Sequence, residues 1–585
     1  MNQRSIAVLP FDNLSSDLEN EYFSDGIAEE IINALSKIQS LKVIARTSSF
    51  AFKGQKIDVR IIGNKLGVSS VIEGSIRKAG NRVRIAVQLI RTDNGFHIWS
   101  ETFDRTLEDI FDLQDEISLL VADRIRENFG HLEIEDHLVT AHTKNFEAYS
   151  LYLKGRFHQL RWNFNEFDDA IEAFEKSTQL DPMFYQPHFG LVQCYGLKAS
   201  WGAMDKEEGL KKADYHLKEG VRINNQTTEA HFALATKSLW VNWNPYEALD
   251  RLKLALSINP NDPESLESAA EAHIALGQFD EAENFIKSAL DVNPLSANHH
   301  FTIGNIYYLQ KDFSTALTHF QKSLEIDPTW EFSIQVSALC YIFLNDKKNL
   351  DELQNNYPNL TEAYLFPHLF HALNNGKPID LKQLPKSEDI YFPWSLWKLI
   401  YAEEKEEAFD YLLTQLEVKR GQYLNFLQEP LNHPITRSEE FQPLIPQVFD
   451  QPSAQSHSKN KGPSNILISE KEQQDYLLKL KNLMQGEHLY TKESLTLRNL
   501  AEAIDLHPNR LSWLIKEAIG KNFNEYINGF RVEAFKKKAL DPSYHHYTLL
   551  GIAYECGFRT KSVFNDFFKK SEGLTPSAWL KKQRK

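Results

Sequence analysis

The first 130 residues alternate between short stretches with apolar residues at every second position and longer stretches with a helical period. Strand-like patterns occur in SIAVLPF, LKVIAR, SSVIEGSIRK, RVRIAVQLI and HIWSETFDR. Helical patterns cover residues 21–38, 59–66 and 107–129. Ala79-Gly80-Asn81 separates two alternating runs and is typical of a hairpin turn. Residues 1–130 are therefore predicted to form an α+β domain.

The middle of the chain repeats with a period of 34 residues. Each copy places an alanine before an amphipathic stretch and a proline at its end: Ala248 and Pro260, Ala282 and Pro294, Ala316 and Pro328. An alanine allows two helices to approach closely, and a proline ends a helix because it lacks an N–H. The pattern resembles the tetratricopeptide repeat, which is a pair of antiparallel helices. We expect an all-α tetratricopeptide-like solenoid over 145–345, followed by divergent helical repeats or a cap over 346–450.

Residues 451–470 are predicted to be a linker. Their first part, QPSAQSHSKNKGPS, is rich in polar residues and has no apolar period, so it cannot bury enough surface to form a core.

Two helix–turn–helix patterns follow in residues 471–585. In LTLRNLAEAIDLHPNRLSWLIKEAIG, two apolar stripes flank the turn Asp505-Leu506-His507, and Pro508 suits the first turn of the second helix. TLLGIAYECGFRTKSVFNDFFKKSEGLTPSAWL repeats the plan around Cys556-Gly557-Phe558, with Thr560 as a helix cap. NFNEYINGFRVEAFKKKAL is predicted to be a long helix that connects them.

The charge of the chain is divided unevenly. The net charge is −15, yet residues 491–585 hold 17 Lys/Arg against 10 Asp/Glu, and the other residues hold 48 against 70. A basic end on an acidic chain favours a polyanionic partner at that end. An incidental basic tail is the alternative.

The C-terminal pattern resembles the AraC-type DNA-binding domain, an all-α double helix-turn-helix. The resemblance rests on LSxxIxExxGKNFxEYIN, FRVExxK, IAYECGF, the S-x-F-x-x-x-FKK run and the G-x-TPS ending. Trp513 and Glu572 depart from the residues common there. The resemblance implies that two recognition helices enter successive major grooves of double-stranded DNA.

The outward positions of the two recognition helices are the candidate DNA contacts. Asn side chains suit adenine, Lys suits guanine and Asp suits the cytosine amino group. The predicted base-facing residues are Asn509, Ser512, Trp513, Lys561, Ser562, Asn565 and Asp566. The predicted phosphate contacts are Arg510, Lys516, Arg559, Lys569 and Lys570. Each of these residues has solvated polar surface as its alternative role, and Trp513 can instead pack over the helix junction.

The N-terminal domain resembles the TolB-like N-terminal domain over nearly all of residues 4–105. That family often combines this domain with tetratricopeptide repeats, and with a nucleotide-cyclase or winged-helix domain that this chain does not contain. The resemblance therefore implies a regulatory or scaffolding role. Gly-containing turns such as Asp25-Gly26 lack the spacing of a phosphate-binding loop.

No catalytic, metal or cofactor motif is recognised. The cysteines Cys194, Cys340 and Cys556 are far apart, and no apolar run approaches the about 20 residues of a membrane helix. We expect a cytoplasmic, non-enzymatic regulator that binds DNA and senses a protein, peptide or other effector in the repeat groove. RNA polymerase is a further candidate partner. The alternatives are a tetratricopeptide scaffold without sequence-specific DNA binding, and an enzyme with an unrecognised site in the N-terminal domain.

Overall fold

The structure is a computed structural model, and it describes residues 4–15, 21–139, 141–160, 164–200, 203–358, 360, 362–387, 389, 391–439, 441 and 470–584. The chain divides into two compact units. The first comprises Met1–Gln114 and Val139–Ser456, and the second comprises Asp115–Leu138 and His457–Lys585. Residues 115–130, expected to belong to the N-terminal domain, thus group with the C-terminal unit. Within the described residues, none of the helices combines the length and apolar character needed to cross a membrane.

A mixed β-sheet forms the centre of the N-terminal region. Its strands are β1 (Ser5–Val8), β2 (Asp12–Asn13), β3 (Lys42–Val43), β4 (Ser70–Ala79), β5 (Arg82–Arg91) and β6 (His97–Thr106). The order is β3-β1-β4-β5-β6, with β2 also paired to β4. β1 runs parallel to β3 and β4, whereas β4, β5 and β6 are antiparallel. Gly80 has a φ of +58° in the predicted hairpin, a conformation that glycine adopts without strain.

The helices of this region are α1 (Glu21–Ser36), α2 (Arg46–Phe50), α3 (Val59–Leu66), a 3₁₀ turn η2 (Leu107–Asp109) and α4 (Ile110–Phe129). Asp58 caps α3 by accepting a hydrogen bond from the Arg60 N–H, and Gly67 ends it with a φ of +65°. The α+β prediction is confirmed. Helix α2 was not predicted, because a five-residue helix is too short to show an apolar period.

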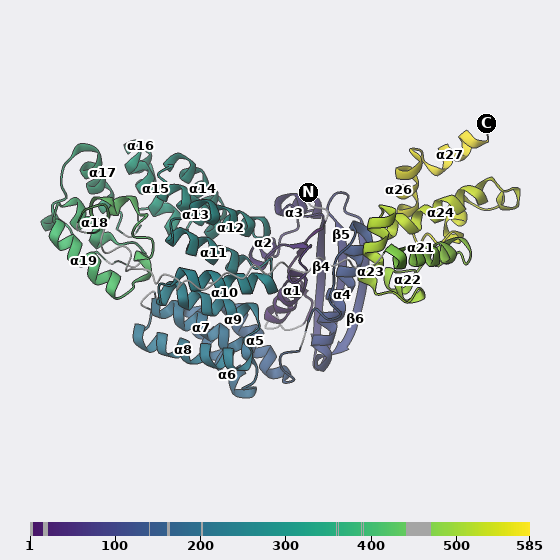
Figure 1. The fold of residues 1–585 in the computed structure, drawn as a ribbon, viewed down its shortest axis with the longest axis horizontal. Helices are drawn as coiled ribbons and strands as arrows, with labels where there is room; N and C mark the ends of the chain where they lie inside the picture. The colour runs from purple at the N-terminus through teal and green to yellow at the C-terminus, as the bar shows by residue number, and fades with distance from the viewer. Residues whose placement is uncertain are drawn as a thin grey trace. The chain divides into compact units, whose positions relative to one another are not determined.

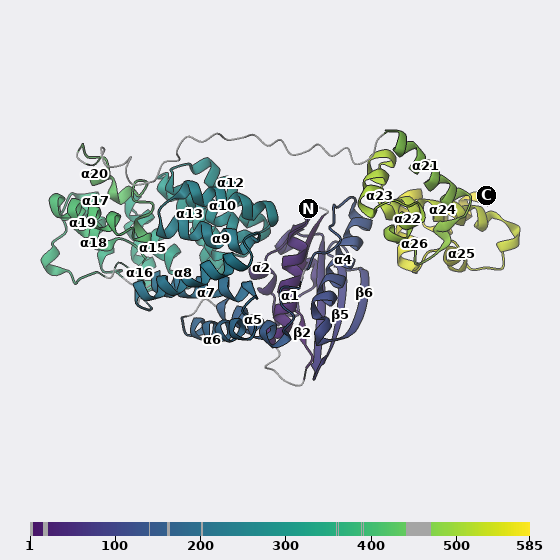
Figure 2. The ribbon, with the colours of Figure 1, turned by 60° about the horizontal axis from the view of Figure 1, so that its bottom comes forward.

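A solenoid of antiparallel helix pairs follows (Figures 1 and 2). Its paired helices are α5 (Phe146–Gln159), α6 (Phe164–Leu180), α7 (Tyr185–Ser200), α8 (Lys206–Ile223), α9 (Thr228–Thr236) with the π-helical turn η3 (Lys237–Val241), α10 (Pro245–Ile258), α11 (Pro263–Ala275), α12 (Phe279–Val292), α13 (Ala297–Leu309) and α14 (Phe313–Ile326). Helices α10, α12 and α14 each end two residues before the repeat proline, as predicted.

Small residues allow the paired helices to approach. Ala248, Ala282 and Ala316 are fully buried. A Cβ on Gly304 of α13 would lie 2.6 Å from the ring of Phe320 on α14, so the aromatic ring packs directly on the backbone of its partner helix.

Helical structure continues beyond the strict repeats. The elements are α15 (Glu331–Phe343), α16 (Lys347–Asn356), α17 (Leu365–Asn375), η4 (Leu381–Gln383), α18 (Trp394–Tyr401), α19 (Lys405–Glu417), η5 (Gly421–Tyr423), η6 (Pro430–Asn432) and α20 (His433–Thr436). One apolar core runs from Ala235 to Phe441, so these helices extend the core of the solenoid. The predicted linker 451–470 lies outside the described residues, except for Glu470.

The sheet region and the solenoid share hydrogen bonds within the first unit. The Ser48 hydroxyl donates to the Asn293 side chain at 2.6 Å, and the Ala45 N–H donates to the Val292 carbonyl at 2.7 Å. The Asn261 side chain donates to the carbonyls of Ser36 and Leu41. Asn261 and Asn293 lie at the ends of repeats, so these turns anchor the N-terminal sheet region.

The C-terminal part of the second unit is all-α. Its elements are α21 (Glu470–Gln485), η8 (Leu489–Thr491), α22 (Leu497–Ala503), α23 (Pro508–Leu514), the π-helical turn η9 (Ile515–Ile519), α24 (Phe523–Leu540), η10 (Pro542–Tyr544), α25 (Leu549–Glu555), α26 (Lys561–Glu572) and α27 (Pro576–Gln583). The predicted fold class is confirmed in all three regions.

Candidate DNA-binding site

Two small apolar cores share the long helix α24. The first core includes Leu500 and Leu511 from α22 and α23, and the second includes Ile552 and Phe564 from α25 and α26. The N-terminal half of α24 contributes to the first core and its C-terminal half to the second. A continuous helix therefore spaces the two helix-turn-helix units, as predicted.

The turn of the first unit depends on a left-handed residue. Asp505 has a φ of +55°, a region that short polar residues tolerate better than branched ones. His507 then caps α23 by accepting from the Asn509 N–H, and Pro508 occupies the first turn, where a missing N–H is harmless.

The turn of the second unit requires glycine. Gly557 has a φ of +95°, and a Cβ there would lie 2.5 Å from the Tyr490 carbonyl oxygen and 2.8 Å from that of Thr491. The hydroxyl of Thr560 accepts from the Val563 N–H at 3.3 Å, which confirms the predicted cap of α26.

Arg531 of α24 holds the segment around η8 in place. Its Nε donates to the Tyr490 carbonyl at 2.7 Å, and its Nη2 donates to the Lys492 carbonyl at 2.9 Å. Burial lowers the pKa of Arg531 to about 10. No role was predicted for Arg531 from the sequence, although a charged side chain between the apolar Phe530 and Val532 is an indication of a buried polar contact.

Most candidate residues of the second recognition helix lie on its exposed side. Asn565 is half-buried, and the others are exposed: Arg559 just before α26, then Lys561, Ser562, Asp566, Lys569 and Lys570. Phe564 and Phe568 face the core. The helix thus presents a polar face that carries every residue predicted for it, although their contact with DNA stays a prediction.

The first recognition helix differs from the expectation at two positions. Ser512 was expected to face outward, but it is buried in this unit, with 7% of its surface exposed. Trp513 packs partly against the first core, which agrees with the alternative role considered for it. Asn509 and Arg510 are half-buried and Lys516 is exposed.

Two of the predicted phosphate contacts have acidic neighbours. The Lys570 ammonium donates to Glu525 at 2.8 Å, and Arg510 lies 3.8 Å from Glu472. Lys570 is largely exposed, so its ion pair contributes little and leaves the cation accessible to a stronger anion.

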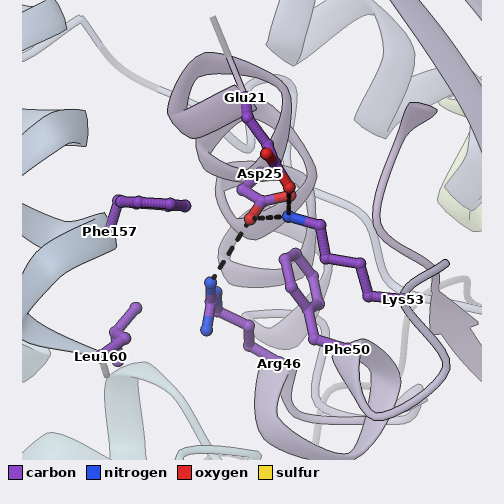
Figure 3. A pocket seen from close by; sticks show the side chains of 7 residues that line it. All are labelled: Glu21, Asp25, Arg46, Phe50, Lys53, Phe157 and Leu160. Atoms are coloured by element: carbon purple, nitrogen blue, oxygen red, sulfur yellow. Dashed lines mark hydrogen bonds and ion pairs between the residues drawn. The ribbon is translucent and has the colours of Figure 1, made fainter. Parts of the chain in front are cut away.

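A separate pocket of about 340 Å³, open to solvent, lies in the first unit (Figure 3). The residues that line it are Glu21, Asp25, Arg46, Phe50, Lys53, Phe157 and Leu160. Lys53 donates to Asp25 at 2.6 Å, and the Arg46 guanidinium lies 4.2 Å from the centre of the Phe50 ring. Burial raises the pKa of Asp25. Because the charges of this pocket are paired with one another, it offers a ligand the apolar side chains of Phe157 and Leu160 more than a free charge.

One group in the described part of the chain has atoms close enough to bind a metal ion. The donor atoms of His158, Glu166 and Asp169 lie within 4.8 Å of one another. His158 Nδ1 is 2.6 Å from Glu166 Oε2, a distance that an ordinary hydrogen bond explains. This group is therefore explained by a hydrogen bond between two side chains.

Family models match three parts of the chain. A helix-turn-helix domain matches residues 500–582, and the second domain of HilA/YgeH-like transcriptional regulators matches residues 2–120. Tetratricopeptide repeats match residues 244–300 and 297–329. The AraC-type helix-turn-helix and the tetratricopeptide predictions are confirmed. The TolB-like resemblance of the N-terminal region stays a prediction.

Curated relatives match parts of the chain. A Rhizobium meliloti protein provisionally named adenylate cyclase 3 is 37% identical over 239 residues, which is 40% of each protein. The transcriptional regulator HilA of Salmonella typhimurium is 19% identical over 56% of this chain and 51% of its own length. The HTH-type transcriptional regulator YobQ of Bacillus subtilis is 33% identical over 15% of this chain and 36% of its own. The chain spans about half or less of the length of each of these relatives.

Solved structures of repeat proteins are similar to part of the chain. A thermophilic TPR protein from Thermus thermophilus is 18% identical with a TM-score of 0.28, and it covers 33% of this chain and 99% of its own. Such TM-scores are too low to support an argument about function.

Proposed function

We propose that this chain is a sequence-specific DNA-binding transcriptional regulator whose N-terminal and repeat regions respond to an effector. The observation that carries the proposal is the pair of helix-turn-helix units built on one continuous helix, α24, with polar residues on the outer side of α26. A rigid spacer fixes the separation of two recognition helices, which is what reading two successive major grooves requires.

The base-reading roles follow from hydrogen-bonding chemistry. The Asn509 and Asn565 amides would each donate to and accept from one adenine, and the Lys561 ammonium would donate to guanine. Ser562 and Asp566 lie on the same face and would contact neighbouring bases. Ser512 and Trp513 would reach DNA only after a local rearrangement, because the first is buried and the second packs on the core.

Phosphate contacts would supply affinity without sequence preference. Arg510, Lys516, Arg559, Lys569 and Lys570 are the proposed donors. Replacing Lys569 with alanine should weaken binding to all sequences similarly and reduce the salt slope by about one.

Genome-wide mapping of bound sites tests the proposal directly. Wild-type chain is expected to occupy a limited set of promoters, and Asn509→Ala or Lys561→Ala should relax or abolish the choice of sites, with a loss of about 1–3 kcal/mol per base contact. Lys582→Ala, in the exposed last turn of α27, is a matched control that should leave site choice unchanged. Uniform binding along the genome by all of these proteins would contradict base reading.

The effector of the first unit is proposed to be a protein or peptide. Tetratricopeptide repeats bury one side of each helix pair and leave a surface that extended segments can occupy. The pocket of Figure 3, next to the first repeat, is a second place for an effector with an aromatic or apolar group. RNA polymerase is a further proposed partner at promoters. Pull-down with residues 139–456 present and deleted, together with promoter activity, would test this part.

A scaffold without DNA recognition is the competing function, and the repeat matches favour it. Electrophoretic mobility shift of the full chain on genomic fragments separates the two. Binding that is absent at moderate salt, or equal on all fragments, would favour the scaffold.

A further inference from the structure

Residues 115–138, the acidic segment, belong to the second unit together with the helix-turn-helix units. The acidic segment consists of the C-terminal part of α4 and the residues after it, and it holds seven Asp/Glu against two Arg. The basic region 491–585 holds 17 Lys/Arg against 10 Asp/Glu. The two parts therefore attract each other by the same electrostatics that attract a basic domain to DNA.

The acidic segment contacts Asn509, the residue proposed to read adenine. Asn509 Nδ2 donates to the Ile134 carbonyl at 2.9 Å, while Asn509 Oδ1 accepts from the Ile134 N–H at 3.2 Å and from Arg126 at 2.5 Å. In the major groove, adenine offers one acceptor, N7, beside one donor, the N6 amino group. The backbone N–H and carbonyl of Ile134 offer the same pair, so they satisfy the amide in the way that an adenine edge would.

Two carboxylates of the acidic segment bind donors of the first helix-turn-helix unit. Asp123 accepts from the Arg498 guanidinium, and Glu127 Oε1 accepts from the Leu497 N–H at 2.9 Å. Arginine side chains and backbone N–H groups are common donors to DNA phosphates. Asp123 and Glu127 are 6% and 4% exposed, and burial raises the pKa of Glu127. Each carboxylate also pairs with an arginine of the acidic segment, Asp123 with Arg126 and Glu127 with Arg124, so the segment holds both carboxylates in position for Arg498 and the Leu497 N–H.

A third contact lies at the start of α24. Asn522 Nδ2 donates to the Asn128 carbonyl at 2.9 Å, and Asn524 Nδ2 donates to Asn128 Oδ1 at 3.0 Å. Together the three contacts extend from α22 to the start of α24 and include the N-terminal end of α23. The acidic segment thus covers the reading edge of the first helix-turn-helix unit, while the candidate residues of α26 stay largely exposed.

We propose that the acidic segment is an intramolecular competitor of DNA, which must leave the first helix-turn-helix unit before that unit can read a site. This inference rests on the proposed function. Helix α4 begins at Ile110 in the first unit and continues into the acidic segment. An effector that favours the released state would therefore raise the population competent for DNA, in proportion to its preference for that state.

The first test compares DNA affinities of full-length proteins. Duplexes of 30 bp are enriched from a random-sequence pool with the Asp123→Ala/Glu127→Ala chain, and dissociation constants are then measured by fluorescence anisotropy. The double variant is expected to bind at least about tenfold more tightly than the wild type. Glu133→Ala/Glu135→Ala is the matched control: it removes two charges from exposed positions of the acidic segment and should change affinity by less than about threefold.

The outcomes separate the inference from the proposed function. Equal affinity of the wild type and the double variant for an enriched sequence would overturn the competitor and leave DNA recognition intact. Failure of every protein to enrich any sequence would overturn the proposed function itself. An equal gain in both double variants would show a general charge effect and would also overturn the competitor.

The second test joins the acidic segment covalently to the first helix-turn-helix unit, so that the segment cannot leave it. Asn128→Cys and Asn524→Cys place two thiols where the side chains now hydrogen-bond, and a short bis-alkylating reagent joins them in the full chain. The native cysteines are all buried, so they react slowly. The joined protein should lose at least about tenfold in affinity for the enriched duplex, and the two alkylated single variants should retain theirs. Unchanged binding by the joined protein would refute the proposal.

Discussion

Replacement of Arg531 with methionine should destabilise the C-terminal helices more than any surface change in the same helix. Arg531 is 8% exposed, and its guanidinium donates to Tyr490, Lys492 and Asn528, the last at 3.2 Å. Methionine keeps the aliphatic packing of the arginine stem and removes all three donors. The substitution therefore isolates the polar contribution.

The magnitude follows from two opposing effects. Loss of the donors leaves two carbonyls without these partners, at about 1–3 kcal/mol each. Burial of the cation opposes this, because desolvation is what lowers the pKa of Arg531 to about 10. Removing an unfavourably buried charge stabilises the folded state and offsets part of the decrease in the free energy of unfolding. We expect a net destabilisation of about 2–4 kcal/mol.

Hydrogen–deuterium exchange of the full chain measures this locally. In Arg531→Met, the free energy of opening of the amides in α24 and around η8 should fall by about 2–4 kcal/mol. Exchange in the solenoid should not change. Lys537→Ala, an exposed position of the same helix, should alter it by less than about 0.5 kcal/mol. A decrease below about 1 kcal/mol in Arg531→Met would show that water replaces the guanidinium without penalty and would refute the reasoning.

Three further predictions concern the turn, the repeats and pH. Gly557→Ala should lower the free energy of opening of α25 and α26 by at least about 2 kcal/mol in the same exchange experiment. An alanine in the left-handed conformation is strained, and its Cβ would meet two carbonyl oxygens. An unchanged free energy of opening would contradict the left-handed turn. Gly304→Ala should destabilise the solenoid by about 1–3 kcal/mol in calorimetry, whereas Gly196→Ala, whose Cβ would meet open space, should be neutral or stabilising. His188 and His216 are buried with Nδ1 atoms 3.0 Å apart, and burial lowers both pKa values, that of His216 to about 4. The unfolded histidines bind protons near pH 6.5, whereas the folded pair binds them only at lower pH. Stability should therefore fall below about pH 6.5, by about 1 kcal/mol at pH 5.5, and His216→Gln should remove most of this dependence in thermal unfolding.

Local patterns predicted the elements well where a period or a special residue specifies the backbone. The 34-residue period placed the ends of α10, α12 and α14, and the glycine and cap residues placed the turn of the second helix-turn-helix unit. The same patterns did not reveal α2, which is too short for a period, and they led us to expect an outward Ser512, which the structure buries. The outward face of α26 was predictable because three phenylalanines mark its inner face.

The sequence by itself determined the classes of structure in this protein: a sheet with helices, a solenoid of helix pairs, and two helix-turn-helix units in a basic end. These follow from periodicity, charge and turn residues, which act over a few neighbours along the chain. Only the tertiary structure decided which distant residues meet, such as Arg531 with Tyr490, Ser48 with Asn293, and Asn509 with Ile134. The physical reason is that a hydrogen bond between residues tens to hundreds of positions apart depends on the packing of whole elements, and no local pattern of apolar and polar residues encodes that packing.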